Sequence, residues 1–194
     1  MKLNMGDIMD YELNLRKADV IGLYIHYVLL AIGILIAGYL IYSNIIREYY
    51  IVALPFIMSM FVFLSIIIYS TTNYEKAITF YKIGVILFIC DILFAVPSQY
   101  TAYGLLVVSL SIMEIILLIY FILHLDDSKH AQTAINLVVI IGIVNLAMTI
   151  NTGNLGTKLL YTFPGLIIQW TLALSYYLAT KKIKYNAIKQ KFTK

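Results

Sequence analysis

Residues 83–100 read IGVILFICDILFAVPSQY, and residues 105–121 read LLVVSLSIMEIILLIYF. Each stretch is long and apolar enough to form most of a membrane-spanning helix. Each also contains one acid, Asp91 in the first and Glu114 in the second. A carboxyl group at membrane depth is costly, so such residues are rare and usually face the interior of a helix bundle. The two stretches therefore predict a helical membrane protein with a polar interior.

The composition of the whole chain supports the same fold class. Of 194 residues, 62% are hydrophobic and 12% are charged, whereas soluble domains contain about 25% charged residues. At about 20 residues per crossing, with short loops, this length allows about six spans. The single cysteine, Cys90, excludes a disulfide framework and a cysteine-ligated cluster. We predict an all-α polytopic membrane protein with one transmembrane domain over residues 1–194.

Apolar runs and helix-breaking residues predict six spans joined by short loops. Pro97 ends the third span, Pro164 suits the first turn of the sixth, and Asp126, Asp127 and Ser128 form a polar turn that can cap the fifth. Residues 1–17 are expected as a cytoplasmic or interfacial segment, 151–156 as a loop, 157–162 as a short interfacial piece and 181–194 as a basic cytoplasmic tail. The expected spans, which make up a six-helix bundle over 18–180, are 18–43, 50–70, 77–96, 102–125, 131–150 and 164–180.

The basic residues predict the orientation. With the N-terminus inside, 12 of the 14 Lys and Arg residues fall on the cytoplasmic side, and only Arg47 and Lys158 lie in outer loops. This bias predicts cytoplasmic N- and C-termini. Because the basic residues flank the spans, they favour contact with the lipid bilayer over binding of nucleic acid. One cysteine, many Ile and Tyr residues and a lysine-rich tail suit a multi-pass protein of a prokaryotic plasma membrane.

Helical spacing places a few polar residues on the inward faces of the spans. The candidate substrate- or ion-binding residues are Asp91, Glu114, Asn145, Gln169 and His26. Counting from the predicted span ends puts Asp91, Asn145 and Gln169 at one level near the outer boundary. The same count puts Glu114 about 10 Å deeper and His26 toward the cytoplasm. The second span has only serines among its apolar residues, so we expect it at the lipid-facing edge.

Two interpretations of the acids remain open at this point. Two carboxyl groups in one apolar site cannot both be ionised cheaply, so the pair would hold a proton or recruit a cation, as in coupled transporters. Alternatively, neutral hydrogen-bonded acids, with Asn145 and Gln169, join the helices without further function. A third chemistry is haem binding, for which His26 and His124 on different helices are the candidate axial ligands. No other cofactor and no other metal site is predicted.

The motifs of serine hydrolases, zinc proteases and phosphate-binding loops are absent from the sequence, so a non-enzymatic role is favoured. The leading hypothesis is a small membrane transport protein: a transporter, a channel or a substrate-binding membrane subunit, coupled to protons or cations. The alternative is a non-catalytic subunit of a larger respiratory or secretion complex, and a third is a b-type haem electron carrier. Expected partners are lipid, a small solute or cation, and a second copy or partner subunit packed on the small residues Gly22, Gly33 and Ala37.

Overall fold

The protein is a bundle of α-helices. The computed structural model describes residues 5–71, 74–95, 104–151 and 155–192, and within these the side chains of 21–70, 77–94, 105–148, 150 and 159–181. In these ranges the backbone forms six helices: α1 (Met5–Ile46), α2 (Tyr50–Thr71), α3 (Tyr74–Ala95), α4 (Gly104–Leu123), α5 (Ser128–Asn151) and α6 (Leu155–Phe192). The predicted all-helical bundle is confirmed.

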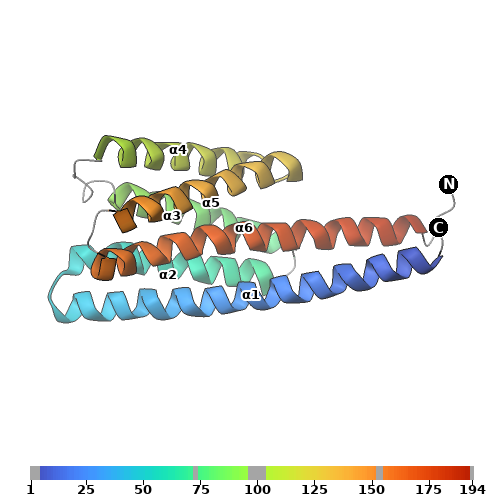
Figure 1. Cartoon of the computed structure of the whole chain (residues 1–194), viewed down its shortest axis with the longest axis horizontal. Helices are drawn as coiled ribbons and strands as arrows, with labels where there is room; N and C mark the ends of the chain where they lie inside the picture. Colours follow the sequence, from blue (N-terminus) through green and yellow to red (C-terminus); the bar gives the residue numbers. More distant parts are fainter. Residues whose placement is uncertain (1–4, 72–73, 96–103, 152–154, 193–194) are drawn as a thin grey trace.

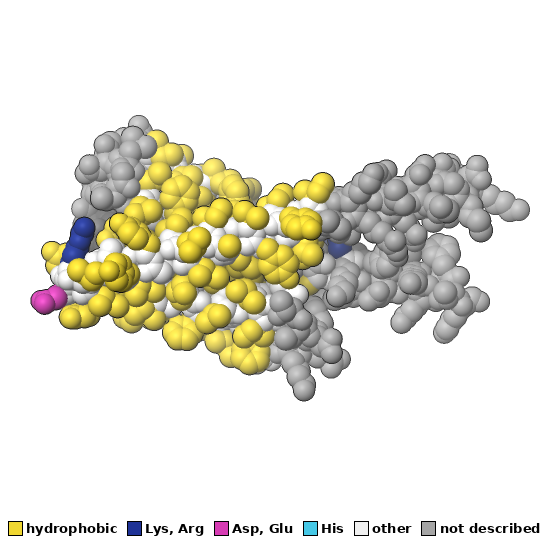
Figure 2. Space-filling view, turned by 90° about the horizontal axis from the view of Figure 1, so that it is seen from below, with side chains coloured by type: hydrophobic (Ala, Val, Ile, Leu, Met, Phe, Trp, Pro, Cys, Tyr) yellow, Lys and Arg dark blue, Asp and Glu magenta, His cyan; other side chains and the backbone are white. Residues whose placement is uncertain are grey.

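Five of these helices are long and apolar enough to cross a membrane. The qualifying segments are Ile21–Ile46, Tyr50–Ser70, Ala77–Phe94, Leu105–Leu123 and Ser128–Met148. Hydrophobic side chains cover most of the described surface on the face drawn in Figure 2. Large apolar side chains such as Leu35 and Leu105 are 72% and 88% exposed. A surface of this kind suits contact with lipid rather than water, so the fold is that of a multi-pass membrane protein.

Consecutive helices pack against one another, as short connections favour. Helix α6 then returns to contact α1 and α2 as well as α5, which closes the bundle. Figure 1 shows α1 and α6 continuing past the other four helices toward the end where both chain termini lie. We call this the terminal end; the α4–α5 turn lies on that side, and the α1–α2 turn lies at the opposite, loop end (Figure 1).

The first and last helices are longer than the sequence predicted. Helix α1 runs without a break from Met5, so the backbone of residues 5–17 of the expected N-terminal segment is continuous with the first apolar stretch, and residues 1–4 lie outside the described residues. Helix α6 runs from Leu155 to Phe192, so the expected short piece at 157–162 and the basic tail up to residue 192 also belong to one helix. Of the expected loop at 151–156, residues 152–154 lie outside the described residues.

The prediction that Pro164 lies in the first turn of the sixth helix is wrong, because α6 begins at Leu155 and this proline lies inside it. The turn before it packs against two other helices. The Tyr161 hydroxyl donates to Asn44 Oδ1 of α1 at 3.2 Å, and the Tyr161 ring meets Phe56 of α2 edge-on at 5.3 Å. Proline is tolerated within membrane helices where neighbouring groups support the interrupted turn. These contacts hold the residues before Pro164 in the helix.

The expectation for the second span is also wrong, because α2 does not lie at a lipid-facing edge. It contacts α1, α3 and α6, and Val62, Phe63 and Ile66 are fully buried. Of its apolar segment, 39% is buried, compared with 22–33% in the other four. An apolar side chain suits both lipid and a packed core. Hydrophobicity alone therefore does not show whether α2 contacts lipid or other helices.

An aromatic layer lies toward the terminal end of the bundle. It consists of Tyr69 of α2, Tyr81 of α3, Phe121 of α4 and Tyr176 of α6, all at most 6% exposed. Tyr69 stacks on Tyr81 at 4.1 Å between ring centroids. Phe121 meets Tyr81 and Tyr176 edge-on at 6.0 and 5.1 Å. Offset-stacked and edge-on rings are the favoured geometries for aromatic pairs, so this layer joins four helices by close packing.

The tyrosine hydroxyls of this layer are bonded to backbone carbonyls. Tyr81 Oη donates to the Leu172 carbonyl at 2.7 Å, and Tyr176 Oη donates to the Leu125 carbonyl at 2.8 Å. Buried hydroxyl groups are costly unless they are hydrogen-bonded. The layer therefore buries its rings without leaving these two hydroxyls unsatisfied.

Candidate functional site

Asp91 and Glu114 lie on adjacent helices and are both buried. Their residues are 9% and 3% exposed, on α3 and α4, which pack together. The two carboxyl groups are close enough to interact electrostatically. Neither forms an ion pair with a described residue. The sequence predicted buried acids in the interior, and the structure places both there without a cationic partner among the described side chains.

Asp91 is paired with a serine of α2. Ser59 Oγ donates to Asp91 Oδ2 at 3.1 Å, and Ser59 is 1% exposed. The sequence interpretation missed this partner because it placed the second span against lipid. A usable signal was present, since Ser59 and Ser70 are eleven residues apart and therefore share one face of α2.

Glu114 is paired with Gln169 of α6. Gln169 Nε2 donates to Glu114 Oε1 at 2.5 Å, and Gln169 is 4% exposed. The predicted depths, which put Gln169 level with Asp91 and Glu114 about 10 Å deeper, are wrong on this point. The error follows from the start of α6, which lies at Leu155 rather than near Pro164. Gln169 is therefore further inside its helix than the sequence suggested.

We call Ser59, Asp91, Glu114 and Gln169 the acid level. Asn145 of α5 is half-buried and lies three residues beyond Gly142, the α5 residue that faces the Gln169 side chain. At about 1.5 Å per residue, Asn145 is about one turn closer to the loop end than Gly142. The structure thus brings Asp91, Glu114 and Gln169 into one buried region, with Asn145 beside it.

His26 lies apart from the acid level, toward the terminal end. It is fully buried, and its Nε2 lies 3.0 Å from Ser70 Oγ. Ser70 Oγ also lies 2.8 Å from the Ile66 carbonyl, to which it donates. His26 Nδ1 has no hydrogen-bond partner among the described residues. Ser70 is eleven residues from Ser59 along α2, which corresponds to about 16 Å.

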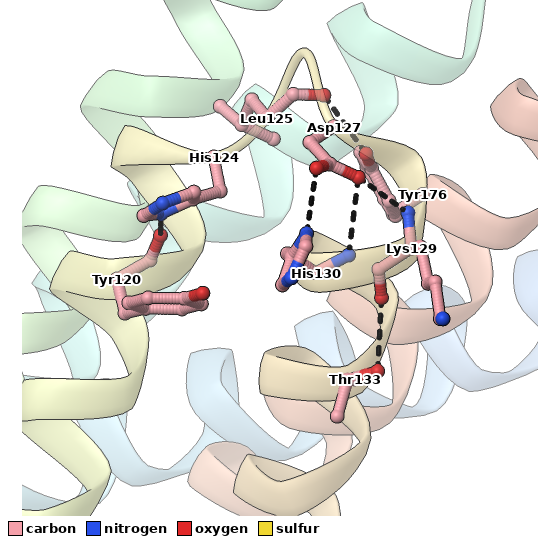
Figure 3. Close-up of polar contacts among 8 residues, drawn as sticks. All are labelled: Tyr120, His124, Leu125, Asp127, Lys129, His130, Thr133 and Tyr176. Atoms are coloured by element: carbon pink, nitrogen blue, oxygen red, sulfur yellow. Dashed lines mark hydrogen bonds and ion pairs between the residues drawn. The ribbon is translucent and has the colours of Figure 1, made fainter.

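His124 lies at the surface of the α4–α5 turn, drawn in Figure 3. Its Nδ1 is 2.9 Å from the Tyr120 carbonyl, and its ring stacks on the Tyr120 ring at 3.9 Å. His26 belongs to α1, which lies on the opposite side of the bundle from α4 (Figure 1). The structure does not bring together the two histidines that the sequence suggested as a haem pair. Within the described ranges, no group of three or more His, Cys, Asp or Glu side chains is placed to hold a metal ion.

Asp127 caps α5, as the polar turn predicted. Its Oδ1 accepts hydrogen bonds from the backbone nitrogens of Lys129 and His130 at 3.1 and 3.4 Å, and its Oδ2 is 2.6 Å from His130 Nδ1 (Figure 3). These hydrogen bonds, chiefly the one from the His130 side chain, lower the pKa of Asp127 below its usual value. The turn is therefore a helix cap on the surface of the bundle and not an extension of the acid level.

Comparison of the chain with protein-family models, with curated proteins and with solved structures found no match. The function is accordingly inferred from the geometry of the acid level.

Proposed function

We propose that the chain is a small membrane transport protein in which all six helices cross the bilayer. Both termini then lie in the cytoplasm, so the terminal end of the bundle is its cytoplasmic end. The support is the distribution of charge, with 12 of 14 Lys and Arg residues on that side. The packing of α6 against α1, α2 and α5 adds support, because it makes α6 an integral part of the bundle. The composition favours a prokaryotic plasma membrane.

The observation that carries the proposal is the burial of two acids whose hydrogen-bond donors, among the described side chains, are neutral. Ser59 serves Asp91 and Gln169 serves Glu114. A carboxylate without a cationic partner is costly in an apolar interior, so an acid there holds a proton or recruits a cation. Two such groups within electrostatic reach of each other form a site at which proton binding at one acid alters cation or proton binding at the other.

The second candidate function is that of a non-catalytic subunit in a larger membrane complex. It is favoured by the fact that each acid joins two helices, α2 with α3 through Asp91 and α4 with α6 through Glu114. Interhelical hydrogen bonds of this kind stabilise membrane bundles. Replacing each acid by its amide distinguishes the two functions, because an amide keeps the hydrogen bond but cannot carry a proton. Transport should then be lost, whereas an interhelical link should remain.

Purified protein in liposomes loaded with the pH dye pyranine separates these functions. We expect the wild-type protein to move protons in response to an imposed K⁺ or Na⁺ gradient. Asp91→Asn and Glu114→Gln should each lower the rate at least about tenfold with little change in Tm, since a tenfold effect needs only about 1.4 kcal/mol at the rate-limiting step. Ser109→Ala, which changes an exposed hydroxyl on α4, is the matched control and should retain the wild-type rate.

A wild-type rate no greater than that of empty liposomes would contradict proton-coupled transport. So would amide variants that lower Tm and leave the rate unchanged. Either result favours the structural-subunit function, in which the acids act only between helices.

A further inference from the structure

The side chain of Gln169 reaches Glu114 by passing over a glycine of α5. A Cβ built on Gly142 would overlap the Gln169 amide oxygen, and it would lie 2.7 Å from Gln169 Cδ and 3.1 Å from Nε2. Side-chain carbons do not approach other atoms this closely, since carbon–carbon contacts are optimal at about 3.5–4.0 Å. Only glycine at position 142 leaves room for the amide in its observed place.

Both ends of the Gln169 amide are therefore held by other helices. Nε2 donates to Glu114 of α4. Oε1 is buried, has no hydrogen-bond partner among the described residues, and lies against Gly142 of α5. A glycine Cα–H group is a weak donor that often meets an oxygen at close helix–helix contacts. The contact with Gly142 fixes which way the amide faces, and so directs its N–H groups toward Glu114.

Other glycines show that this arrangement is local. A Cβ at Gly165 or Gly38 would meet nothing within 4 Å. A Cβ at Gly84 would overlap Ser65, and one at Gly33 would overlap Phe63. Among the glycines whose surroundings are described, only at Gly142 is the space of the missing Cβ filled by a side chain that binds a buried acid.

We propose that Gly142 is a positioning residue for Glu114, acting through Gln169. Gly142 has no side chain with which to bind either acid. It leaves the space in which the Gln169 amide lies across α5, and it thereby joins α4, α5 and α6 at the level of Glu114. Any effect of Gly142 on proton movement rests on the proposed transport function. Its positioning of the Gln169 amide does not rest on that function.

The positioning is tested by NMR on the full-length protein in nanodiscs with ¹⁵N-labelled glutamine side chains. The Gln169 amide resonances are assigned as those missing in Gln169→Leu. We expect Gly142→Ala to move them toward the position that they take in Glu114→Ala, because both changes separate the amide from the carboxyl group. Gly165→Ala makes the same chemical change in open space and should leave them in place. Unchanged Gln169 resonances in Gly142→Ala would overturn the proposal.

A double-mutant cycle keeps the proposal testable if Gly142→Ala folds poorly. In the Gln169→Ala background the long amide is absent, so an alanine at 142 has nothing to overlap. Gly142→Ala should lower Tm by at least about 3 °C in the wild-type background and by far less in the Gln169→Ala background. Equal losses in both backgrounds would show that Gly142 acts without Gln169, which contradicts the proposal.

The pyranine assay separates failure of this inference from failure of the transport function. If wild-type protein moves protons, Gly142→Ala should lower the rate several-fold and Gly165→Ala should not. If wild-type protein moves none, the transport function fails, while the NMR shift and the cycle still decide whether Gly142 positions the amide.

Discussion

The aromatic layer and the acid level are built from the same four helices. Each of α2, α3, α4 and α6 contributes one residue to each: Tyr69 and Ser59, Tyr81 and Asp91, Phe121 and Glu114, Tyr176 and Gln169. The paired residues are ten, ten, seven and seven positions apart, or about 10–15 Å along the helices. One layer buries aromatic rings, and its Tyr81 and Tyr176 hydroxyls donate to backbone carbonyls. The other buries two acids, each of which accepts from one neutral side-chain donor among the described residues.

The difference between the two layers is what the proposed transport function requires. Packed aromatic rings stabilise a bundle without any ionisable group, so stability alone does not require acids about two to three turns away. Buried acids are expensive in an apolar interior and are therefore expected where a protein binds or moves something. Helices α2, α3, α4 and α6 thus form the packed aromatic layer toward the terminal end and carry the acid level nearer the loop end.

The largest loss of stability is expected when a ring is removed from the aromatic layer. Phe121→Ala removes a fully buried ring that contacts Tyr81 and Tyr176, and should cost about 3–5 kcal/mol of stability through lost packing and a cavity. Ile119→Ala, on the exposed face of the same helix, is the control and should cost far less. Thermal unfolding in detergent measures both. Equal losses for the two variants would mean that the aromatic layer is not a stability centre.

A smaller loss is expected when the acid level loses a donor. Gln169→Leu leaves the Glu114 carboxyl group buried without its described partner, which should cost about 1–3 kcal/mol. Gln132→Leu removes an amide that bonds the exposed Asn136 within α5, and should be nearly neutral. Denaturant unfolding of both variants checks the contrast. A neutral Gln169→Leu would show that Glu114 does not depend on this amide for its stability in the core.

Removing single hydroxyl groups from the aromatic layer should have a still smaller effect. Tyr81→Phe and Tyr176→Phe keep the rings and delete the bonds to the Leu172 and Leu125 carbonyls, so each should cost about 0.5–1.5 kcal/mol. Tyr39→Phe, at an exposed position of α1, is the matched control. If the hydroxyl deletions cost as much as Phe121→Ala, hydrogen bonding rather than ring packing would hold this layer together.

The smallest loss of stability is expected for a substitution outside both layers, at the cap of α5. The pKa of Asp127 is lowered in the folded protein by its bonds to His130 and Lys129, so its ionised form stabilises the fold above the ordinary aspartate pKa. That contribution is lost as the pH falls through the lowered pKa. Asp127→Ala should therefore reduce Tm slightly at neutral pH, and the difference from wild type should shrink under strongly acidic conditions. A difference that grows on acidification would contradict this account of the cap.

Much of the architecture could be predicted because each helix carries its own signal. The apolar runs predicted α2 to α5 to within a few residues, and Asp127 predicted the cap of α5. The failures occurred where a neighbouring helix decides the outcome. Tyr161 packs against Asn44 and Phe56 and keeps the chain helical before Pro164. The burial of α2 depends on contacts with α1, α3 and α6 that its uniformly apolar sequence does not specify.

The sequence by itself determined that this chain forms apolar helices with acids at Asp91 and Glu114, because hydrophobicity, helical period and charge are properties of each segment alone. Only the tertiary structure decided which group each acid meets. Ser59 reaches Asp91 from a helix that hydrophobicity had assigned to lipid, and Gln169 reaches Glu114 across Gly142. Partner choice depends on the rotation and depth of helices relative to one another, and these are set by packing between segments far apart in the chain.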